Sequence, residues 1–65
     1  MTLEKARELL SVQVSLGGGY NRNSAKLILA EVQAEHGQEA VDRLIRELGL
    51  EPVFGLVPGT RFERP

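Results

Sequence analysis

The amino-acid sequence predicts a small all-α domain of three helices, followed by an irregular apolar C-terminal segment. Apolar residues recur at helical spacing in three stretches, glycines separate these stretches, and prolines and glycines crowd the last part of the chain. We expect the three helices to cover residues 2–15, 23–36 and 38–48. With 65 residues the chain is close to the lower size limit for independent folding, so we expect one domain, 1–65.

The composition limits how such a small domain can be held together. The chain has no cysteine and one histidine, so disulfides are excluded and a structural zinc site, which needs four nitrogen or sulfur ligands, is not expected. Good packing or self-association is therefore the remaining source of stability for the folded chain. We therefore expect no metal and no cofactor.

The first helix is predicted from apolar residues at nearly helical spacing, with charged residues on the other face. These apolar residues are Leu3, Ala6, Leu9, Leu10 and Val14. Thr2 is a suitable N-cap, because its hydroxyl can accept a hydrogen bond from a backbone N–H of the first turn. The end of this helix is open. Residues 12–16 alternate with the period of a strand, so they are compatible with helix or extended chain, and we take the helix to about Ser15.

Three consecutive glycines, residues 17–19, are expected to end the first helix and to open a loop that continues through Asn23. Asn21 or Asn23 can cap the second helix. That helix is predicted from Ala25, Ile28, Leu29 and Val32, and Gly37 is expected to end it after His36. The wide apolar arc of this helix predicts that it is the central one.

The third helix has a narrow apolar stripe and a charged opposite face, which is the clearest amphipathic pattern in the chain. Its stripe consists of Val41, Leu44, Ile45 and Leu48. Gly49 is expected to end the helix in the left-handed conformation, with Leu50 packing back on Ile45.

The C-terminal segment, 52–65, is expected to be extended and to follow a helical core of residues 1–51. Because prolines and glycines recur after Glu51, no helix is expected there. Residues 57–60, Val-Pro-Gly-Thr, predict a type II turn. Unlike most disordered tails the segment is apolar, so we expect it to pack across the helices of its own core or of a partner.

The least ordinary feature is the glycine-rich loop, because it precedes a helix N-terminus, where free N–H groups attract anions. Arg22 could add a charge-assisted hydrogen bond. The candidate anion or small-ligand residues are Gly17, Gly18, Gly19, Tyr20, Asn21, Arg22 and Asn23. The loop lacks the Lys-Ser/Thr pair of a phosphate-binding P-loop, so a plain turn with a capped helix is the simpler interpretation.

The sequence places Gly37 between two predicted helices, and this arrangement is similar to a helix-turn-helix motif that binds DNA as a dimer. The second helix would present Gln38, Glu39, Asp42 and Arg43 to DNA, and Arg22, Arg46 and Arg61 could contact phosphates. Two carboxylates at the leading edge and a net charge of −1 disfavour nucleic acid as a partner.

The first hypothesis is a non-enzymatic protein-interaction domain that binds itself as a homodimer or binds another protein. Three short helices cannot cover every large apolar side chain, and exposed apolar patches commonly mark partner sites. The candidate interface residues are Leu27, Phe54, Leu56, Val57 and Phe62. The alternative is that the C-terminal segment completes the core of the single chain.

Catalysis and a membrane location are not expected. There is no cysteine nucleophile, no serine has a recognisable base nearby in sequence, and the lone His36 has no evident partner, so we expect no enzyme and no catalytic residue. No stretch approaches the ~20 apolar residues that span a bilayer. The N-terminal residues carry both charge signs, unlike a signal peptide, so we expect a cytoplasmic location.

Overall fold

The computed structural model describes residues 1–17 and 19–63, including all of their side chains except those of residues 19 and 20. Within these residues the fold is all-helical, as predicted, with four helices. They are α1 (Leu3–Leu16), α2 (Gly19–His36), α3 (Gln38–Leu48) and α4 (Leu50–Phe54). No helix in these described ranges combines the length and the apolar character needed to cross a membrane.

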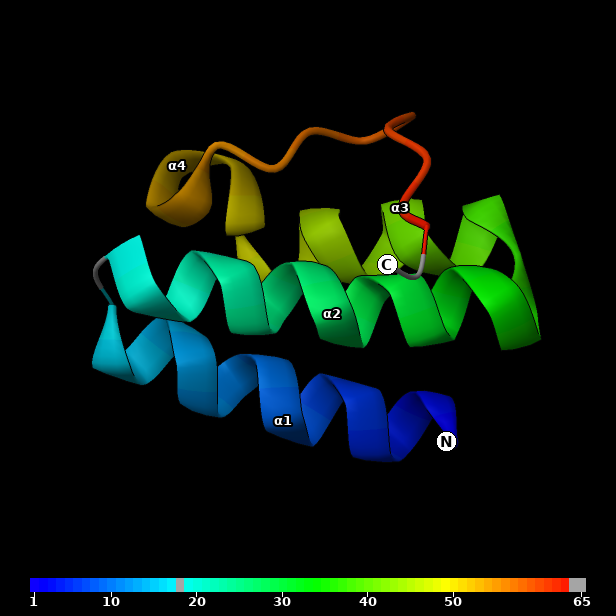
Figure 1. The fold of residues 1–65 in the computed structure, drawn as a ribbon, viewed down its shortest axis with the longest axis horizontal. Helices are drawn as coiled ribbons and strands as arrows, with labels where there is room; N and C mark the ends of the chain where they lie inside the picture. Colours follow the sequence, from blue (N-terminus) through cyan, green and yellow to red (C-terminus); the bar gives the residue numbers. More distant parts are fainter. Residues whose placement is uncertain (18, 64–65) are drawn as a thin grey trace.

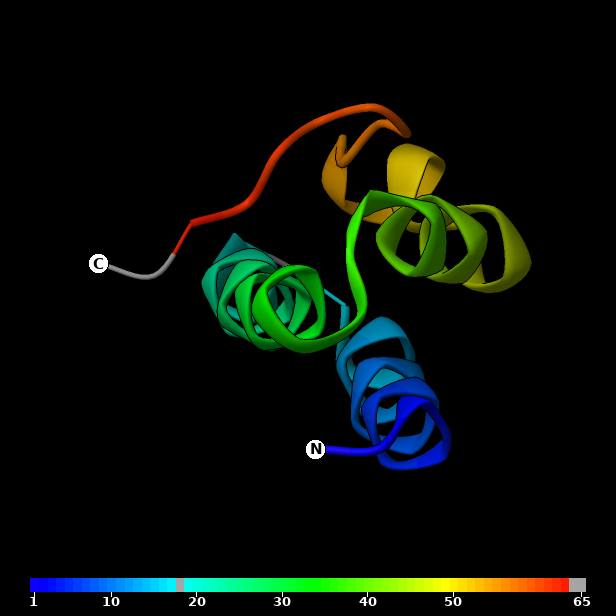
Figure 2. The ribbon, with the colours of Figure 1, turned by 90° about the vertical axis from the view of Figure 1, so that its right-hand side faces the viewer.

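The three longer helices form a triangular bundle that measures 26 × 24 × 21 Å. α1 and α2 run antiparallel as a hairpin, and α3 returns along α2 (Figure 1). An end-on view shows α1, α2 and α3 at the corners of a triangle (Figure 2). After α4, the C-terminal segment arches from the α3 side of the bundle to the α2 side, which leaves it positioned to close the bundle from above.

Helix α1 begins where the sequence predicts. Thr2 is extended, with φ −78° and ψ 159°, and its Oγ1 accepts a hydrogen bond of 3.0 Å from the backbone N–H of Lys5. The helix continues to Leu16, so the open question about residues 12–16 is resolved in favour of helix. The helix pairs the backbone groups of this stretch within α1, whereas a strand would have had no partner for them, and Val14 packs against the core.

The predicted loop over residues 17–23 is wrong, because α2 begins at Gly19. Gly17 makes the turn with φ 64° and ψ −174°, and its N–H bonds the carbonyl of Gln13 at 3.0 Å. The side-chain amide of Asn21 donates to the carbonyl of Gly17, so Asn21 serves the end of α1 instead of capping α2. A glycine in the first turn of a helix is tolerated because the first N–H groups have no helical acceptor in any case.

The expectation of no helix after Glu51 is also wrong, because Leu50–Phe54 form the short helix α4. Pro52 is the third residue of this helix, where its missing N–H breaks no helical hydrogen bond. The left-handed ending of α3 is as predicted: Gly49 has φ 63° and ψ 43°, and its N–H bonds the carbonyl of Ile45. A second left-handed glycine, Gly55, ends α4.

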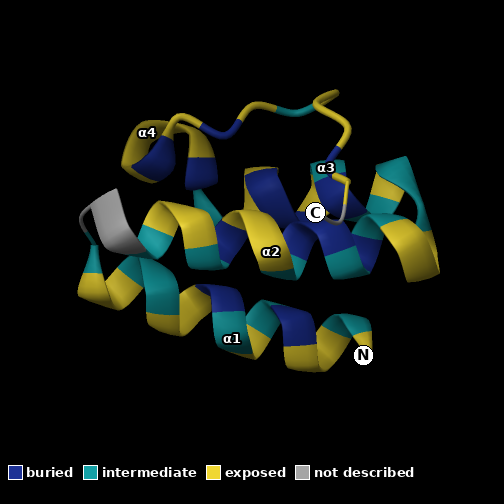
Figure 3. Cartoon of the chain, in the orientation of Figure 1, coloured by how far each residue is buried: buried dark blue, intermediate teal, exposed yellow. Residues whose placement is uncertain are grey.

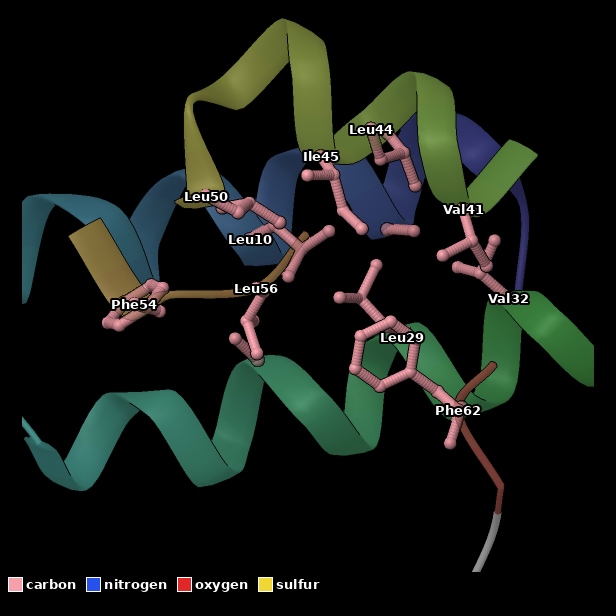
Figure 4. Packing of buried hydrophobic residues seen from close by; sticks show 13 residues of the cluster. Leu10, Leu29, Val32, Val41, Leu44, Ile45, Leu50, Phe54, Leu56 and Phe62 are labelled. Atoms are coloured by element: carbon pink, nitrogen blue, oxygen red, sulfur yellow. The ribbon is translucent and has the colours of Figure 1, made fainter. Parts of the chain in front are cut away.

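The core is one cluster of apolar side chains from all four helices and from the C-terminal segment (Figures 3 and 4). Its members are Ala6, Leu10, Ala25, Leu29, Ala30, Val32, Val41, Leu44, Ile45, Leu50, Phe54, Leu56 and Phe62. The accessible surface of the chain is 4006 Å², and scaling with mass predicts about 4,100 Å² for a folded monomer of this size. The single chain is therefore about as compact as a self-sufficient monomer.

The C-terminal segment packs on its own core, which is one of the two alternatives left open by the sequence. Leu56 and Phe62 are buried, and both lie between α2 and the α3–α4 side of the bundle. The type II turn between them is as predicted: Gly59 has φ 89°, and the N–H of Thr60 bonds the carbonyl of Val57 at 3.3 Å. This turn brings Phe62 back toward α2 after Leu56 has entered the core.

Replacing Phe62 by alanine should destabilise the isolated chain by about 3 kcal/mol, because it removes a buried ring from the core. Urea unfolding measures the loss, and Val57→Ala, which truncates a half-exposed side chain of the same segment, is the matched control. The urea midpoint of the wild-type chain should be the same at low and high protein concentration. A wild-type midpoint that rises with concentration would contradict closure of the core within one chain.

Replacing Gly17 by alanine or by asparagine should destabilise the fold by about 1–3 kcal/mol, because positive φ with extended ψ is accessible essentially to glycine only. No atom within 4 Å would meet the added Cβ, so the effect is conformational and not steric. Gly49→Asn is the comparison, since asparagine tolerates the left-handed helical conformation of that site. Equal losses of unfolding free energy for Gly17→Asn and Gly49→Asn would contradict this assignment.

Candidate functional site

A hollow of about 400 Å³ lies between α2 and the C-terminal segment. Its lining residues come from α2 and from the chain after α4: Arg22, Lys26, Gly55, Leu56, Val57, Thr60, Arg61, Phe62 and Glu63. The buried side chains of Leu56 and Phe62 form its apolar floor, and exposed polar and charged residues form its rim. We call this hollow the α2 groove.

Among the described residues, three cations and one carboxylate line the α2 groove. Arg22 and Lys26 are four residues apart on α2, so they lie on the same face of the helix, and Arg61 approaches from the C-terminal segment. The carboxylate is Glu63, whose Oε1 lies 3.3 Å from Nε of Arg61. Both side chains of this pair are about three-quarters exposed, so water screens their attraction and the pair is weak.

Arg22 is fixed by the end of α4. Its Nε donates a hydrogen bond of 2.9 Å to the backbone carbonyl of Phe54. This carbonyl belongs to the last residue of α4, where the helix supplies no donor. Arg22 therefore stabilises α4 and is held with its guanidinium at the wall of the α2 groove.

Lys26 differs from the other two cations because Arg22 is bonded to the carbonyl of Phe54 and Arg61 is paired with Glu63. No described residue, in 1–17 or 19–63, forms an ion pair with its ammonium group, and the residue is exposed. Its charge is thus available to an external anion.

Side chains of α2 and α3 hold the outer wall of the groove in place. Oδ1 of Asp42 accepts hydrogen bonds from the backbone N–H of Gly59 at 2.7 Å and from the amide of Gln38 at 2.9 Å. The same Gln38 amide donates to the carbonyl of Thr60 at 2.8 Å. Oε1 of Gln33 accepts from the N–H of Phe62 at 3.3 Å. We call these contacts the turn clasp.

The turn clasp favours the ionised form of Asp42. The hydrogen bond from Gly59 lowers the pKa of this carboxyl below its ordinary value of 3.8, the bond from Gln38 lowers it further, and nearby Arg46 also favours the charge. Asp42 is thus an anion at neutral pH, which suits its role as the double acceptor of the clasp.

Of the described side chains in the predicted anion loop, only that of Arg22 lines the α2 groove. Gly17 and Gly19 occupy the turn and the start of α2, and the amide of Asn21 is bonded to Gly17. Gly18 and the side chain of Tyr20 lie outside the described residues. Asn23 lines a neighbouring hollow of about 270 Å³, together with Lys26, Leu27 and Glu63.

Three of the five candidate interface residues are core residues of this chain. Phe54, Leu56 and Phe62 are buried, because the C-terminal segment folds back across α2, and they leave little exposed surface for a partner. Leu27 and Val57 remain exposed, at 54% and 42%. Leu27 lines the smaller hollow and Val57 lines the α2 groove.

The helix-turn-helix interpretation loses one of its base-reading side chains. Gln38, at the start of α3, is bonded to Asp42 and to the carbonyl of Thr60, so it holds the C-terminal segment and does not project from the surface. Glu39 and Arg43 are exposed on the same helix and line a hollow of mixed charge with Arg46 and Glu47. This face of α3 has no excess of positive charge.

His36 lies at the end of α2, as expected, and its Nε2 is 2.9 Å from the carbonyl oxygen of Met1. The contact joins the end of α2 to the start of α1. Among the described residues no group of three histidine, cysteine, aspartate or glutamate side chains is placed to hold a metal ion.

Lys26 and Glu63 are charged site residues that sequence reasoning missed. The spacing of Arg22 and Lys26 could have indicated a cationic face on α2. The proximity of Arg61 to this face could not have been predicted from sequence, because the position of Arg61 depends on the turn at 57–60.

Comparison of the chain with known protein families, with curated protein sequences and with solved structures finds no match.

An Asp42→Asn variant should be less stable than the wild type at neutral pH, and the gap should close in acid. The folded pKa of Asp42 is lowered, so its stabilisation is present in full above about 3.8 and is lost as the pH falls through the folded value. Urea unfolding across an acidic pH series measures the gap. Glu39→Gln, which removes an exposed carboxylate from the same helix, controls for charge. A gap that does not change with pH would refute the role of the charge.

Proposed function

We propose that this domain is a non-enzymatic binding module that recognises an anionic group through Arg22, Lys26 and Arg61. The observation that carries the proposal is the convergence of three cations, from two separate parts of the chain, on one hollow with a single carboxylate. The chain as a whole has a net charge of −1, so this local excess of positive charge is not a by-product of a basic composition.

Binding is a better account of the groove than catalysis. Its lining has no histidine, no cysteine and no pair of carboxylates, so it offers no group of the kinds that usually transfer protons at neutral pH. Arginine and lysine supply fixed charge and hydrogen-bond donors instead, and these are the means by which proteins hold carboxylates and phosphates.

Self-association and DNA recognition receive less support and stay predictions, as does a cytoplasmic location. A homodimer was expected to cover apolar side chains, yet the chain already buries Phe54, Leu56 and Phe62 and has the accessible surface of a compact monomer. DNA recognition through α3 would have to release Gln38 from the turn clasp.

Titration with tripolyphosphate at low salt tests the proposal. The backbone amide resonances of Arg22, Lys26 and Arg61 should shift, and the affinity should fall as salt is added, because the cations are exposed. The double variant Lys26→Glu/Arg61→Glu should bind about tenfold more weakly or worse, since two attractive pairs become repulsive.

The control is Lys5→Glu/Arg43→Glu, which makes the same change in net charge at exposed positions outside the groove lining. Its affinity should stay within about twofold of wild type at moderate salt, where distant charges are screened. The absence of any resonance shift at low salt, or equal losses in the two double variants, would refute an anion site at the α2 groove.

A further inference from the structure

We infer that the anionic ligand of the α2 groove is a linear acidic segment of a partner protein that also carries apolar side chains. This inference rests on the proposed function and names the class of its ligand. It follows from the length of the groove, from the apolar side chains beside its cations and from the charge of the remaining molecule.

A second hollow adjoins the α2 groove, and we call the two hollows together the channel. The hollow of about 400 Å³ and the hollow of about 270 Å³ share two lining residues, Lys26 and Glu63. They are therefore adjacent, and together they extend from Thr60 and Arg61 to Asn23 and Leu27 on α2. A channel of this kind suits an elongated chain better than a compact ion.

Exposed apolar side chains accompany the cations along this channel. Leu27 is 54% exposed in the smaller hollow, and Val57 is 42% exposed in the α2 groove. A free phosphate or a sugar phosphate would leave both side chains in water, whereas a peptide with leucine-like residues between its carboxylates would cover them. Burial of this apolar surface would then add to the charge attraction.

The cations themselves are arranged for a surface ligand. Arg22, Lys26 and Arg61 are all exposed, and no charged side chain is buried anywhere in the described part of the chain. A site that encloses a single phosphate would be expected to desolvate its cations and to surround the ion with backbone N–H groups. This groove instead keeps its three cations exposed to solvent, which suits the carboxylates of a peptide bound on the surface.

A nucleic acid fits the molecule less well than an acidic peptide. Nucleic-acid affinity grows with the number of phosphates neutralised, and beyond the groove the surface is of mixed sign, with a net charge of −1 for the chain. The outward face of α3 carries Glu39 and Glu47 beside its arginines. A long polyanion would meet these carboxylates, whereas a short peptide would not leave the groove.

Glu63 indicates how such a ligand would bind. Its carboxylate lies in both hollows and already pairs with Arg61, so it occupies one of the positions that a carboxylate of the partner would take. The partner must displace it. Removing this internal competitor should therefore strengthen binding.

Three labelled peptides of equal length test the inference by fluorescence anisotropy with the full chain. In the first, glutamate and leucine alternate; in the second, serine replaces leucine; in the third, glutamine replaces glutamate. The first should bind most tightly, with affinity losses of about fivefold or more for each of the other two. Glu63→Gln should strengthen binding of the first peptide about twofold to threefold.

Apolar variants separate peptide recognition from anion recognition. Leu27→Ser/Val57→Ser should weaken binding of the glutamate–leucine peptide about fivefold or more and leave tripolyphosphate binding unchanged. Val12→Ser/Leu16→Ser, at exposed positions on α1, is the matched control and should alter neither. All four side chains are substantially exposed, so the variants should fold, which circular dichroism checks.

The outcomes distinguish the inference from the proposed function. If tripolyphosphate and the glutamate–serine peptide bind as tightly as the glutamate–leucine peptide, the anion site stands and the apolar peptide ligand is refuted. If a labelled DNA duplex binds more tightly than the peptide, the ligand class is likewise refuted. If no anionic probe binds at low salt, the proposed function and the inference both fail.

Discussion

The closure of the helical bundle by a non-helical segment is the constraint on which the rest of the structure depends. α1, α2 and α3 enclose the core from three sides (Figure 2), and Leu56 and Phe62 complete it on the side between α2 and the α3–α4 unit (Figure 4). The turn at 57–60 sets the distance between these two side chains, and the turn clasp anchors the turn to α3. The α2 groove is thus the outer surface of a segment whose inner surface belongs to the core.

The parts of the fold that could be predicted from sequence are those governed by local chemistry. The N-cap at Thr2, the left-handed ending at Gly49 and the turn at 57–60 each depend on a few neighbouring residues, and each is found as expected. The early start of α2 and the existence of α4 were missed for one shared reason. Glycine and proline disfavour the interior of a helix, yet both are tolerated in its first turn, where N–H groups are not used by the helix.

The site was harder to predict because its members meet through tertiary structure. Arg22 was identified from sequence, but as part of a loop that turned out to be helix. Its actual surroundings depend on the position of α4, whose last carbonyl it binds, and on the return of the chain at Phe62. Phe54, Leu56 and Phe62 were correctly identified as too apolar for a free tail, but apolarity alone does not distinguish a chain's own core from that of a partner.

The side chains of the C-terminal segment form two sets, one that packs in the core and one that faces solvent. Leu56 and Phe62 point into the core, while their neighbours Val57, Arg61 and Glu63 face solvent. Substitutions at the outward positions change the charge and shape of the groove without touching the packing that closes the bundle. Single substitutions at these outward positions can therefore alter the surface of the α2 groove and keep the same fold and nearly the same stability.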